Sequence, residues 1–371
     1  MGNPFYYGSI VPEDKFCNRR EEINELKRDI NNGLNILIYS PRRFGKSSLI
    51  IQTLSELKRE ENLKSVYVDL MGISSKDEFI NEYFNALAKS LETNTDKIIN
   101  FFKSVLKIKP SIKAVFDSSG ETRFHLEFSK EASNQTLKEV LEIPRKFSEK
   151  GIKIAVAFDE FQEIEILGLE NIIRSQIQKH SNKVSYIFMG SKKSILNRMF
   201  TDKSRAFYKF VKHFHLREIP EKEWIKFIQD GFSKTGKKIQ KKYIKEILKI
   251  TKGFPYYTQQ FAYELWELTD KKVDEMILGK ALELIMEREE DLFAVEWENL
   301  TSNQKKALKL IVEKEGKFLY DEAMLSKYEL KIGSLRKTLL SLLEKDIIDK
   351  KEDAYYIQDP LFEHWLKKKI Y

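Results

Sequence analysis

The chain has 371 residues, of which 42% are hydrophobic and 33% are charged, and its 65 basic and 57 acidic residues give a formal net charge of +8. This composition predicts a globular protein of two or three domains, and the lack of an apolar run of about 18 residues excludes a membrane-spanning helix. The one cysteine, Cys17, cannot form an internal disulfide, so we expect a reducing compartment, most simply the cytoplasm.

Apolar runs of five to seven residues alternate with longer helical patterns over the first 219 residues. The runs span residues 35–39, 65–70, 152–158, 184–189 and 213–219, and the main helical patterns span residues 46–59, 76–91 and 134–149. Runs that are apolar on both faces are typical of strands covered by helices on both sides. The alternation predicts an α/β fold with a mainly parallel five-stranded sheet. Residues 110–129 interrupt it as an irregular insertion that could form a hairpin.

Beyond residue 219 the strand pattern stops and helical patterns take over. They span residues 221–233, 240–251, 256–269 and 273–291, and then 303–314, 321–328 and 334–345, followed by two short strand-like segments at 347–351 and 354–358. Thr301 and Gln304 form a capping box before the fifth of these helices. Three helices followed by a β-hairpin form the sequence of elements that is typical of a winged-helix domain. We therefore expect three domains: residues 1–219, 220–299 and 300–371.

Residues 40–47, which we call the phosphate loop, lie between a predicted strand and a predicted helix. They match the template G-x-x-x-x-G-K-[ST] at Gly45, Lys46 and Ser47, with Ser40 in place of the first glycine. A turn before a helix N-terminus points backbone N–H groups at an anion. Lys46 would add a charge for the β- and γ-phosphates, and Ser47 a hydroxyl for Mg²⁺. The residues expected to line the phosphates are Ser40, Pro41, Arg42, Arg43, Phe44, Gly45, Lys46, Ser47 and Ser48.

Two carboxylates, Asp159 and Glu160, follow the predicted strand 152–158. Parallel-sheet proteins bind ligands at the carboxyl ends of their strands. Asp159 would hold Mg²⁺ through water, and Glu160 would act as the general base that polarises the attacking water. The alternative, a helix-capping acid at an ordinary turn, is less consistent with a phosphate loop in the same chain.

Two weaker candidate sites follow the acidic pair. Ser191 comes directly after the run 184–189 and could lie between the γ-phosphate and the attacking water, although an ordinary turn would look the same. Arg205 and Lys209 precede the fifth strand. Either could stabilise charge on the transferring phosphoryl group, and the alternative is a solvated basic face.

Several motifs together resemble the archaeal-type ATPase family, which is related to the AAA+ and STAND signal-transduction ATPases. They are Asn3-Pro4-Phe5, the element Phe16, Asn18-Arg19 and Glu22, and the segments PRRFGKSSL, VYVDL, AFDEFQEI, IFMGS and Gly253-Phe254-Pro255. The resemblance implies an extra strand between the phosphate-loop strand and the acidic strand, and then a helical lid. It also implies that Pro255 lies near the adenine or ribose and that Phe16 and Arg19 border the base. Ser40 and Lys209 depart from the family pattern.

These observations predict an ATP-binding, Mg²⁺-dependent ATPase of the AAA+/STAND-like type that acts as a nucleotide-driven conformational switch. We expect ATP/ADP and Mg²⁺ as ligands, with a protein partner or self-association and no membrane. The alternative is a DNA-binding winged-helix regulator in which nucleotide is structural or regulatory. Helix 334–345 would then carry Arg336 and Lys337 outward, with Lys331 just before it. The 15 basic and 12 acidic residues of 300–371 favour DNA less.

Overall fold

The computed structural model describes the whole chain except residues 1, 108–109, 118–119, 181 and 371. It divides into two compact units. The sheet unit comprises residues 19–40 and 46–216, and the helical unit comprises residues 1–18, 41–45 and 217–371. The first 18 residues and the middle of the phosphate loop thus pack with the C-terminal half of the chain. The three domain ranges expected from the sequence stay a prediction.

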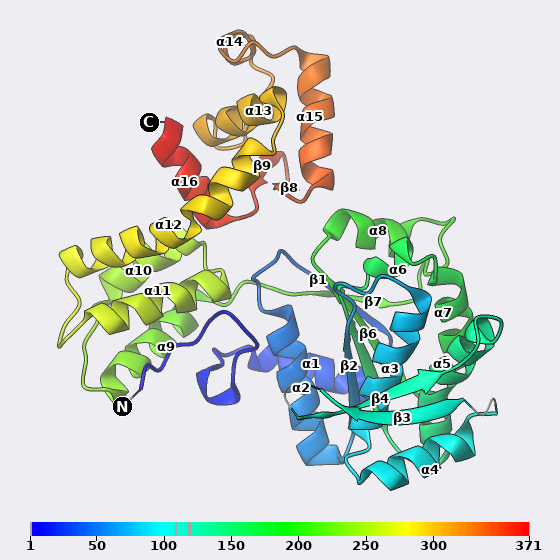
Figure 1. Cartoon of the computed structure of the whole chain (residues 1–371). Helices are drawn as coiled ribbons and strands as arrows, with labels where there is room; N and C mark the ends of the chain where they lie inside the picture. The colour runs from blue at the N-terminus through cyan, green and yellow to red at the C-terminus, as the bar shows by residue number, and fades with distance from the viewer. Residues whose placement is uncertain (1, 108–109, 118–119, 181, 371) are drawn as a thin grey trace. The chain divides into compact units, whose positions relative to one another are not determined.

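The sheet unit is built on a five-stranded parallel sheet in the order β2-β5-β6-β1-β7 (Figure 1). Its strands are β1 (Ile36–Tyr39), β2 (Lys64–Asp69), β5 (Ile154–Asp159), β6 (Ser185–Gly190) and β7 (Lys212–His215). The expected parallel α/β sheet is confirmed. Strand β6 lies between β1 and β5, as the family resemblance implied. The last strand is shorter than expected, because it ends at His215 and not at residue 219.

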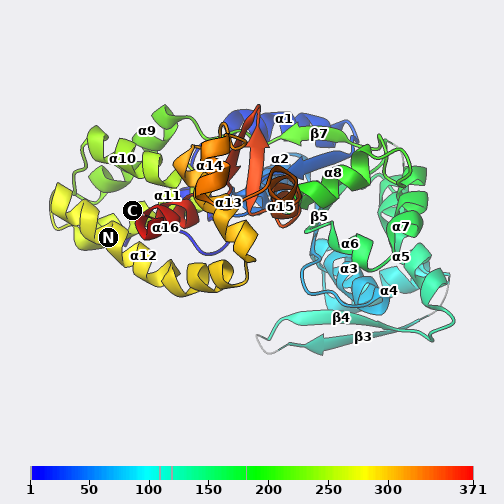
Figure 2. The same ribbon diagram turned by 90° about the horizontal axis from the view of Figure 1, so that it is seen from above.

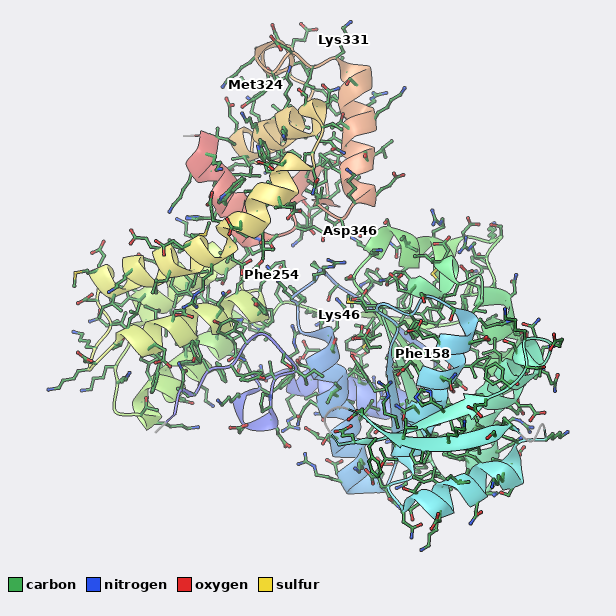
Figure 3. The ribbon with its side chains drawn as sticks, in the orientation of Figure 1. Lys46, Phe158, Phe254, Met324, Lys331 and Asp346 are labelled. Carbon is green, nitrogen blue, oxygen red and sulfur yellow. The ribbon has the colours of Figure 1, made fainter. Side chains whose placement is uncertain are left out.

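Helices cover both faces of this sheet, so its central strands are almost entirely apolar, apart from Asp159 at the end of β5 and Ser185 and Gly190 at the two ends of β6. Every residue of β5 and β6 is buried, and Phe158, which Figure 3 labels within the sheet unit, stacks with Tyr186 and Phe188. Helices α1 (Arg20–Asn31) and α2 (Lys46–Glu61) pack together against the sheet, and α3 (Lys76–Ser90) and α5 (Ser133–Glu149) pack together on the opposite side (Figure 1). Double-sided burial explains why the sequence shows runs without alternation.

Shorter elements complete the sheet unit. They are α4 (Thr95–Val105), β3 (Ser111–Phe116), β4 (Thr122–Glu127), α6 (Glu163–Ile166), α7 (Glu170–Ile177), η2 (Gln178–His180) and α8 (Lys193–Thr201). Strands β3 and β4 pair as an antiparallel hairpin with α3 and α4 nearby (Figure 2), so the insertion is a hairpin as expected. The sequence analysis did not predict α1, α4 or the short helices around the acidic strand.

The helical unit begins, after the short turn η1 (Glu13–Lys15), with four helices. These are α9 (Glu221–Lys234), α10 (Lys241–Thr251), α11 (Pro255–Leu268) and α12 (Glu275–Glu298). The first three match the expected ranges closely, and α12 runs to Glu298, seven residues beyond the expected end. Phe5 of the N-terminal segment is buried against the rings of Phe227 and Phe232 on α9. That contact explains why the first residues belong to this unit.

The same unit ends in the expected winged-helix order. Its elements are α13 (Ser302–Glu313), α14 (Glu322–Lys327), α15 (Ile332–Glu344), β8 (Ile348–Lys351), β9 (Ala354–Ile357) and a last helix, α16 (Pro360–Ile370), that the sequence analysis missed. Thr301 and Gln304 form the expected capping box at the start of α13. Of the helices within the described ranges, none combines the length and the apolar character needed to cross a bilayer.

Candidate functional site

The phosphate loop connects β1, which ends at Tyr39, to α2, which begins at Lys46. Gly45 has a φ of +85°, a left-handed conformation that favours glycine. Arg43 has a φ of +64° without being a glycine, a conformation that needs support from its surroundings. Ser40 has no such positive φ, so the serine that replaces the first glycine of the template fits without backbone strain.

Lys46 occupies the first turn of α2 (Figure 3). Its side chain is buried, and its Nζ donates a hydrogen bond to the backbone oxygen of Ser40 at 2.9 Å. A buried ammonium needs a polar partner, and here the loop carbonyl holds it at the start of the helix. The charge therefore lies beside the N-terminus of α2, where an anion is favoured.

Asp159 is the last residue of β5, and its side chain is 5% exposed. The hydroxyl of Ser47 donates to its Oδ2 at 2.5 Å, and the hydroxyl of Tyr67 on β2 donates to the same atom at 2.6 Å. The backbone N–H of Glu160 donates to Oδ1 at 3.0 Å. A hydroxyl next to a carboxylate offers hard oxygen donors, which suit Mg²⁺. The structure thus brings together the two residues predicted to hold the metal.

Tyr67 was not predicted from the sequence. It lies within a half-buried strand, where the sequence signals only packing, and it reaches Asp159 because β2 and β5 pair in register, with Tyr67 opposite Ala157. Burial, together with the charge of Asp159, raises the pKa of Tyr67 far above its usual range, so the phenol stays a donor. Burial likewise raises the pKa of Asp69 at the end of β2, and the charges of Asp159 and Glu160 add to the effect.

Glu160 follows β5 with a φ of +49°, again left-handed without being a glycine. The hydroxyl of Ser191, directly after β6, donates to Glu160 Oε2 at 3.1 Å, and the side-chain amide of Gln162 donates to the same oxygen. Gln162 was not predicted. It is buried against Gly190, where an added Cβ would lie 2.1 Å from the Gln162 Oε1. Gly190 thus makes the space that lets Gln162 reach Glu160.

The two candidate cations are placed elsewhere in the sheet unit. The guanidinium of Arg205 bonds the carboxylates of Glu165 on α6, at 2.9 Å, and Glu170 on α7. Burial disfavours its charge, but these two partners outweigh burial and raise the pKa of Arg205. Lys209 is exposed, with its ammonium 5.5 Å from the ring of Tyr208. The partners of Arg205 and of Lys209 therefore do not belong to the strand ends that carry Asp159 and Glu160.

The remaining predicted residues divide between the two units. Arg19, in the sheet unit, is buried with a φ of +63° and pairs with Glu22 at 3.2 Å. Ser48 is buried in α2. Phe16, Pro41, Arg42, Phe44 and Pro255 belong to the helical unit. There the ring of Phe44 packs edge-on against Phe254, at 5.2 Å between centroids, so the loop contacts the Gly253-Phe254-Pro255 element.

This arrangement, a phosphate loop before a helix with an acid pair at the end of a parallel strand, defines a P-loop nucleotide-binding fold. Residues 16–261 match the sequence profile of a family described as ATPase domains predominantly from Archaea. The chain belongs to this family. Residues 291–368 match the profile of a probable winged-helix domain, which agrees with the fold of that segment.

Three known proteins show how far the similarity extends. An uncharacterised ATP-binding protein of Methanocaldococcus jannaschii is 32% identical over 108 residues, and that match spans 28% of each chain. A Walker-type ATPase of Pyrococcus abyssi has a similar structure with a TM-score of 0.71 and 19% identity, covering 98% of this chain and 99% of the other. The ORC2 protein of Aeropyrum pernix, in ADPNP and ADP complexes, gives a TM-score of 0.59 and 14% identity, covering 99% and 97%. At these identities the two structures support the fold.

Proposed function

We propose that this protein is a Mg²⁺-dependent ATPase that couples ATP hydrolysis to a conformational switch of the AAA+/STAND-like type. The single observation that carries the proposal is the cluster at the strand ends. Ser47 contacts Asp159, and the neighbouring Glu160 is held by Ser191 and Gln162. The family supplies the ATPase class. The relative of M. jannaschii and the ORC2 protein, which are linked to ATP and to ADP by their descriptions, support adenine nucleotide as the ligand.

Each residue of the cluster has a distinct task in this proposal. Lys46 and the N–H groups at the start of α2 bind the β- and γ-phosphates. Ser47 and Asp159 would hold Mg²⁺, which when bound neutralises charge on the phosphate oxygens. Glu160 accepts the proton of the attacking water, while Ser191 and Gln162 fix the orientation of its carboxylate. Arg205 and Lys209 stay candidate phosphoryl-stabilising cations, and the base contacts of Phe16, Arg19 and Pro255 stay predictions.

Two substitutions separate binding from hydrolysis. Lys46→Ala removes the ammonium group at the start of α2 that is expected to bind the β- and γ-phosphates, so binding of ATP measured by calorimetry should be lost. Glu160→Gln keeps the shape of the side chain and removes its basicity, so binding should persist while turnover falls about 10²- to 10⁴-fold. Binding of ATP by Lys46→Ala with unchanged affinity would contradict the proposed site. Undiminished hydrolysis by Glu160→Gln would remove that residue from the role of base.

We also propose that the switch acts on a protein partner or a second copy of the chain and that basal hydrolysis is slow. ATP turnover that rises with protein concentration would support self-association. A DNA-binding regulator is the second candidate, because Lys331, Arg336 and Lys337 are exposed at or just before α15 (Figure 3 labels Lys331). A salt-dependent shift of duplex DNA that is lost when Arg336 and Lys337 are replaced would favour it. No shift at low salt would reject it.

A further inference from the structure

Arg43 of the phosphate loop is bonded to the winged-helix segment of the helical unit. Its guanidinium donates to the hydroxyl of Tyr257 on α11 and to Asp359 Oδ2 at 3.3 Å. The Tyr257 hydroxyl in turn donates to the same Asp359 oxygen. A third contact places Arg43 at 3.6 Å from a carboxylate oxygen of Glu289 on α12. The arginine, the phenol and the aspartate therefore form a closed triangle of polar contacts.

The backbone of Arg43 is held from the same side. The N–H of Tyr256 donates to the backbone oxygen of Arg43 at 3.3 Å, and the guanidinium lies 5.1 Å and 5.0 Å from the ring centres of Tyr256 and Tyr257. Cation–π contacts of this kind add to the polar ones. Both the side chain and the main chain of this loop residue are thus fixed by the helical unit.

This support matters because of the backbone conformation of Arg43. A φ of +64° is unfavourable for a residue with a Cβ, and such residues persist only where their surroundings determine them. Arg43 stands three positions before Lys46, so its conformation helps to set the path of the loop. If the triangle is opened, other loop conformations become populated. The fraction of protein that is ready to bind phosphate then falls.

Asp359 connects this triangle to the last helix. It directly precedes α16, and its Oδ1 accepts hydrogen bonds from the N–H groups of Leu361 at 2.9 Å and Phe362 at 3.1 Å. One carboxylate therefore caps α16 through one oxygen and holds the phosphate loop through the other. Burial raises the pKa of Asp359, while the Phe362 N–H and the charge of Arg43 oppose that rise.

We propose that Asp359 is a positioning residue of the phosphate loop, acting through Arg43, and that nucleotide binding is thereby coupled to the start of α16. This inference rests on the proposed nucleotide binding and adds a residue of the winged-helix segment to its control. Coupling between two sites is reciprocal. A nucleotide that stabilises the loop conformation must therefore also stabilise the cap of α16, and a weakened cap contact must weaken nucleotide binding.

The test uses Asp359→Asn in the full chain, with a nonhydrolysable ATP analogue and Mg²⁺ as the probe. Asparagine caps helices as well as aspartate does, so the thermal midpoint should change little while the charge that holds Arg43 is lost. We expect the dissociation constant to rise about 5-fold, the lower end of typical coupling, because the pair is about one-third exposed. Asp321→Asn is the matched control, since Asp321 caps α14 through Met324 N–H, and its affinity should equal that of wild type.

Two further measurements distinguish positioning from general stability. Arg43→Gln should weaken binding, and the double variant Arg43→Gln/Asp359→Asn should bind no more weakly than Arg43→Gln alone, because the two residues act through one contact. In hydrogen exchange, the analogue should slow the Leu361 and Phe362 amides in wild type and in Asp321→Asn. In Asp359→Asn this protection should be absent.

The outcomes separate this inference from the function on which it rests. A wild-type protein that binds no nucleotide overturns the proposed function itself. If wild type binds the analogue but Asp359→Asn binds equally well, or if the losses of the two single variants add in the double variant, the positioning role of Asp359 is wrong. If binding leaves the amides of α16 unchanged in wild type, the coupling is wrong.

Discussion

At its amino end, strand β6 contributes Tyr186 to a buried polar cluster, whereas at its carboxyl end it leads through Gly190 to Ser191 beside Glu160. In the first cluster the Tyr186 hydroxyl lies 2.7 Å from His180 Nδ1, and His180 Nε2 lies 3.0 Å from Glu142 Oε2. At the other end Ser191 and Gln162 both donate to one oxygen of Glu160. The two clusters share a strand and similar residue types, yet we assign chemistry to only one.

The two clusters at the ends of β6 differ in the geometry of their residues and not in how deeply these residues are buried. The ring of His180 uses both nitrogens within its cluster, and burial lowers its pKa even though Glu142 opposes the shift, so a neutral ring is favoured. Such a closed network stabilises packing. At the carboxyl end, Glu160 adopts a left-handed backbone next to a second carboxylate and the start of α2. Unfavourable backbone conformations and concentrated like charges occur at functional sites.

Of the substitutions that compare the two ends of β6, Gly190→Ala at the carboxyl end should have the largest effect. The added Cβ would lie 2.1 Å from Gln162 Oε1 and 2.9 Å from Leu196 Cδ1, so Gln162 must move and its bond to Glu160 is lost. We expect turnover to fall about 10- to 100-fold, since general-base catalysis contributes about 10²- to 10⁴-fold. Nucleotide affinity should stay near that of wild type. Steady-state ATPase assays and calorimetry measure both.

A matched glycine provides the control for this substitution. Gly279 lies within α12, and an added Cβ there meets nothing within 4 Å. Gly279→Ala should therefore leave turnover unchanged and raise stability by about 0.5–1 kcal/mol, because alanine suits a helix better than glycine. Equal turnover in Gly190→Ala and wild type would show that Gln162 does not orient Glu160, and the comparison between the two ends of β6 would lose its main support.

At the amino end, Tyr186→Phe should affect stability and not chemistry. Removing the hydroxyl leaves one ring nitrogen of His180 buried without its partner, which costs about 1–3 kcal/mol. Denaturant unfolding should be followed by far-UV circular dichroism, because all four tryptophans lie in the helical unit. Nucleotide affinity and turnover should match wild type. A loss of turnover without a loss of stability would assign a functional role to this cluster as well.

Much of the architecture could be predicted from the sequence, because burial leaves a direct pattern. Central strands covered on both faces are largely apolar, and β5 and β6, in which every residue is buried, are the examples. Where the pattern is weak, the prediction failed. Short helices such as α6 and α7 carry too few turns to show a period, and the run that contains β7 extends to Leu216 and Ile219, beyond the point where its strand pairing ends at His215.

The site was predicted only where residues are close in sequence or end a strand. Lys46, Ser47 and Asp159 follow from a template and from strand order. Tyr67 and Gln162 could not be predicted, because one depends on strand register and the other on the space above Gly190. The contact between Arg43 and Asp359 joins residues 316 positions apart. No local pattern reports a pairing that depends on how distant segments pack.

The smallest expected effect is a pH dependence at the amino end of β6. Burial lowers the pKa of His180 below the value of about 6.5 that the unfolded chain has. Between these two values the unfolded state binds more protons, so stability falls as the pH drops through 6.5 toward the lower, folded pKa. From pH 7.5 to 5.5, wild type should lose up to about 1 kcal/mol more free energy of unfolding than His180→Asn, because one proton contributes at most about 1.4 kcal/mol per pH unit.

His213 and His364 also have lowered pKa values, but both remain in the variant, so their contributions cancel in the difference between the two proteins. An equal loss in the two proteins, measured by denaturant unfolding at both pH values, would mean that His180 accepts a proton in the folded state as readily as in the unfolded one. The closed network at this end of the strand would then not exclude charge.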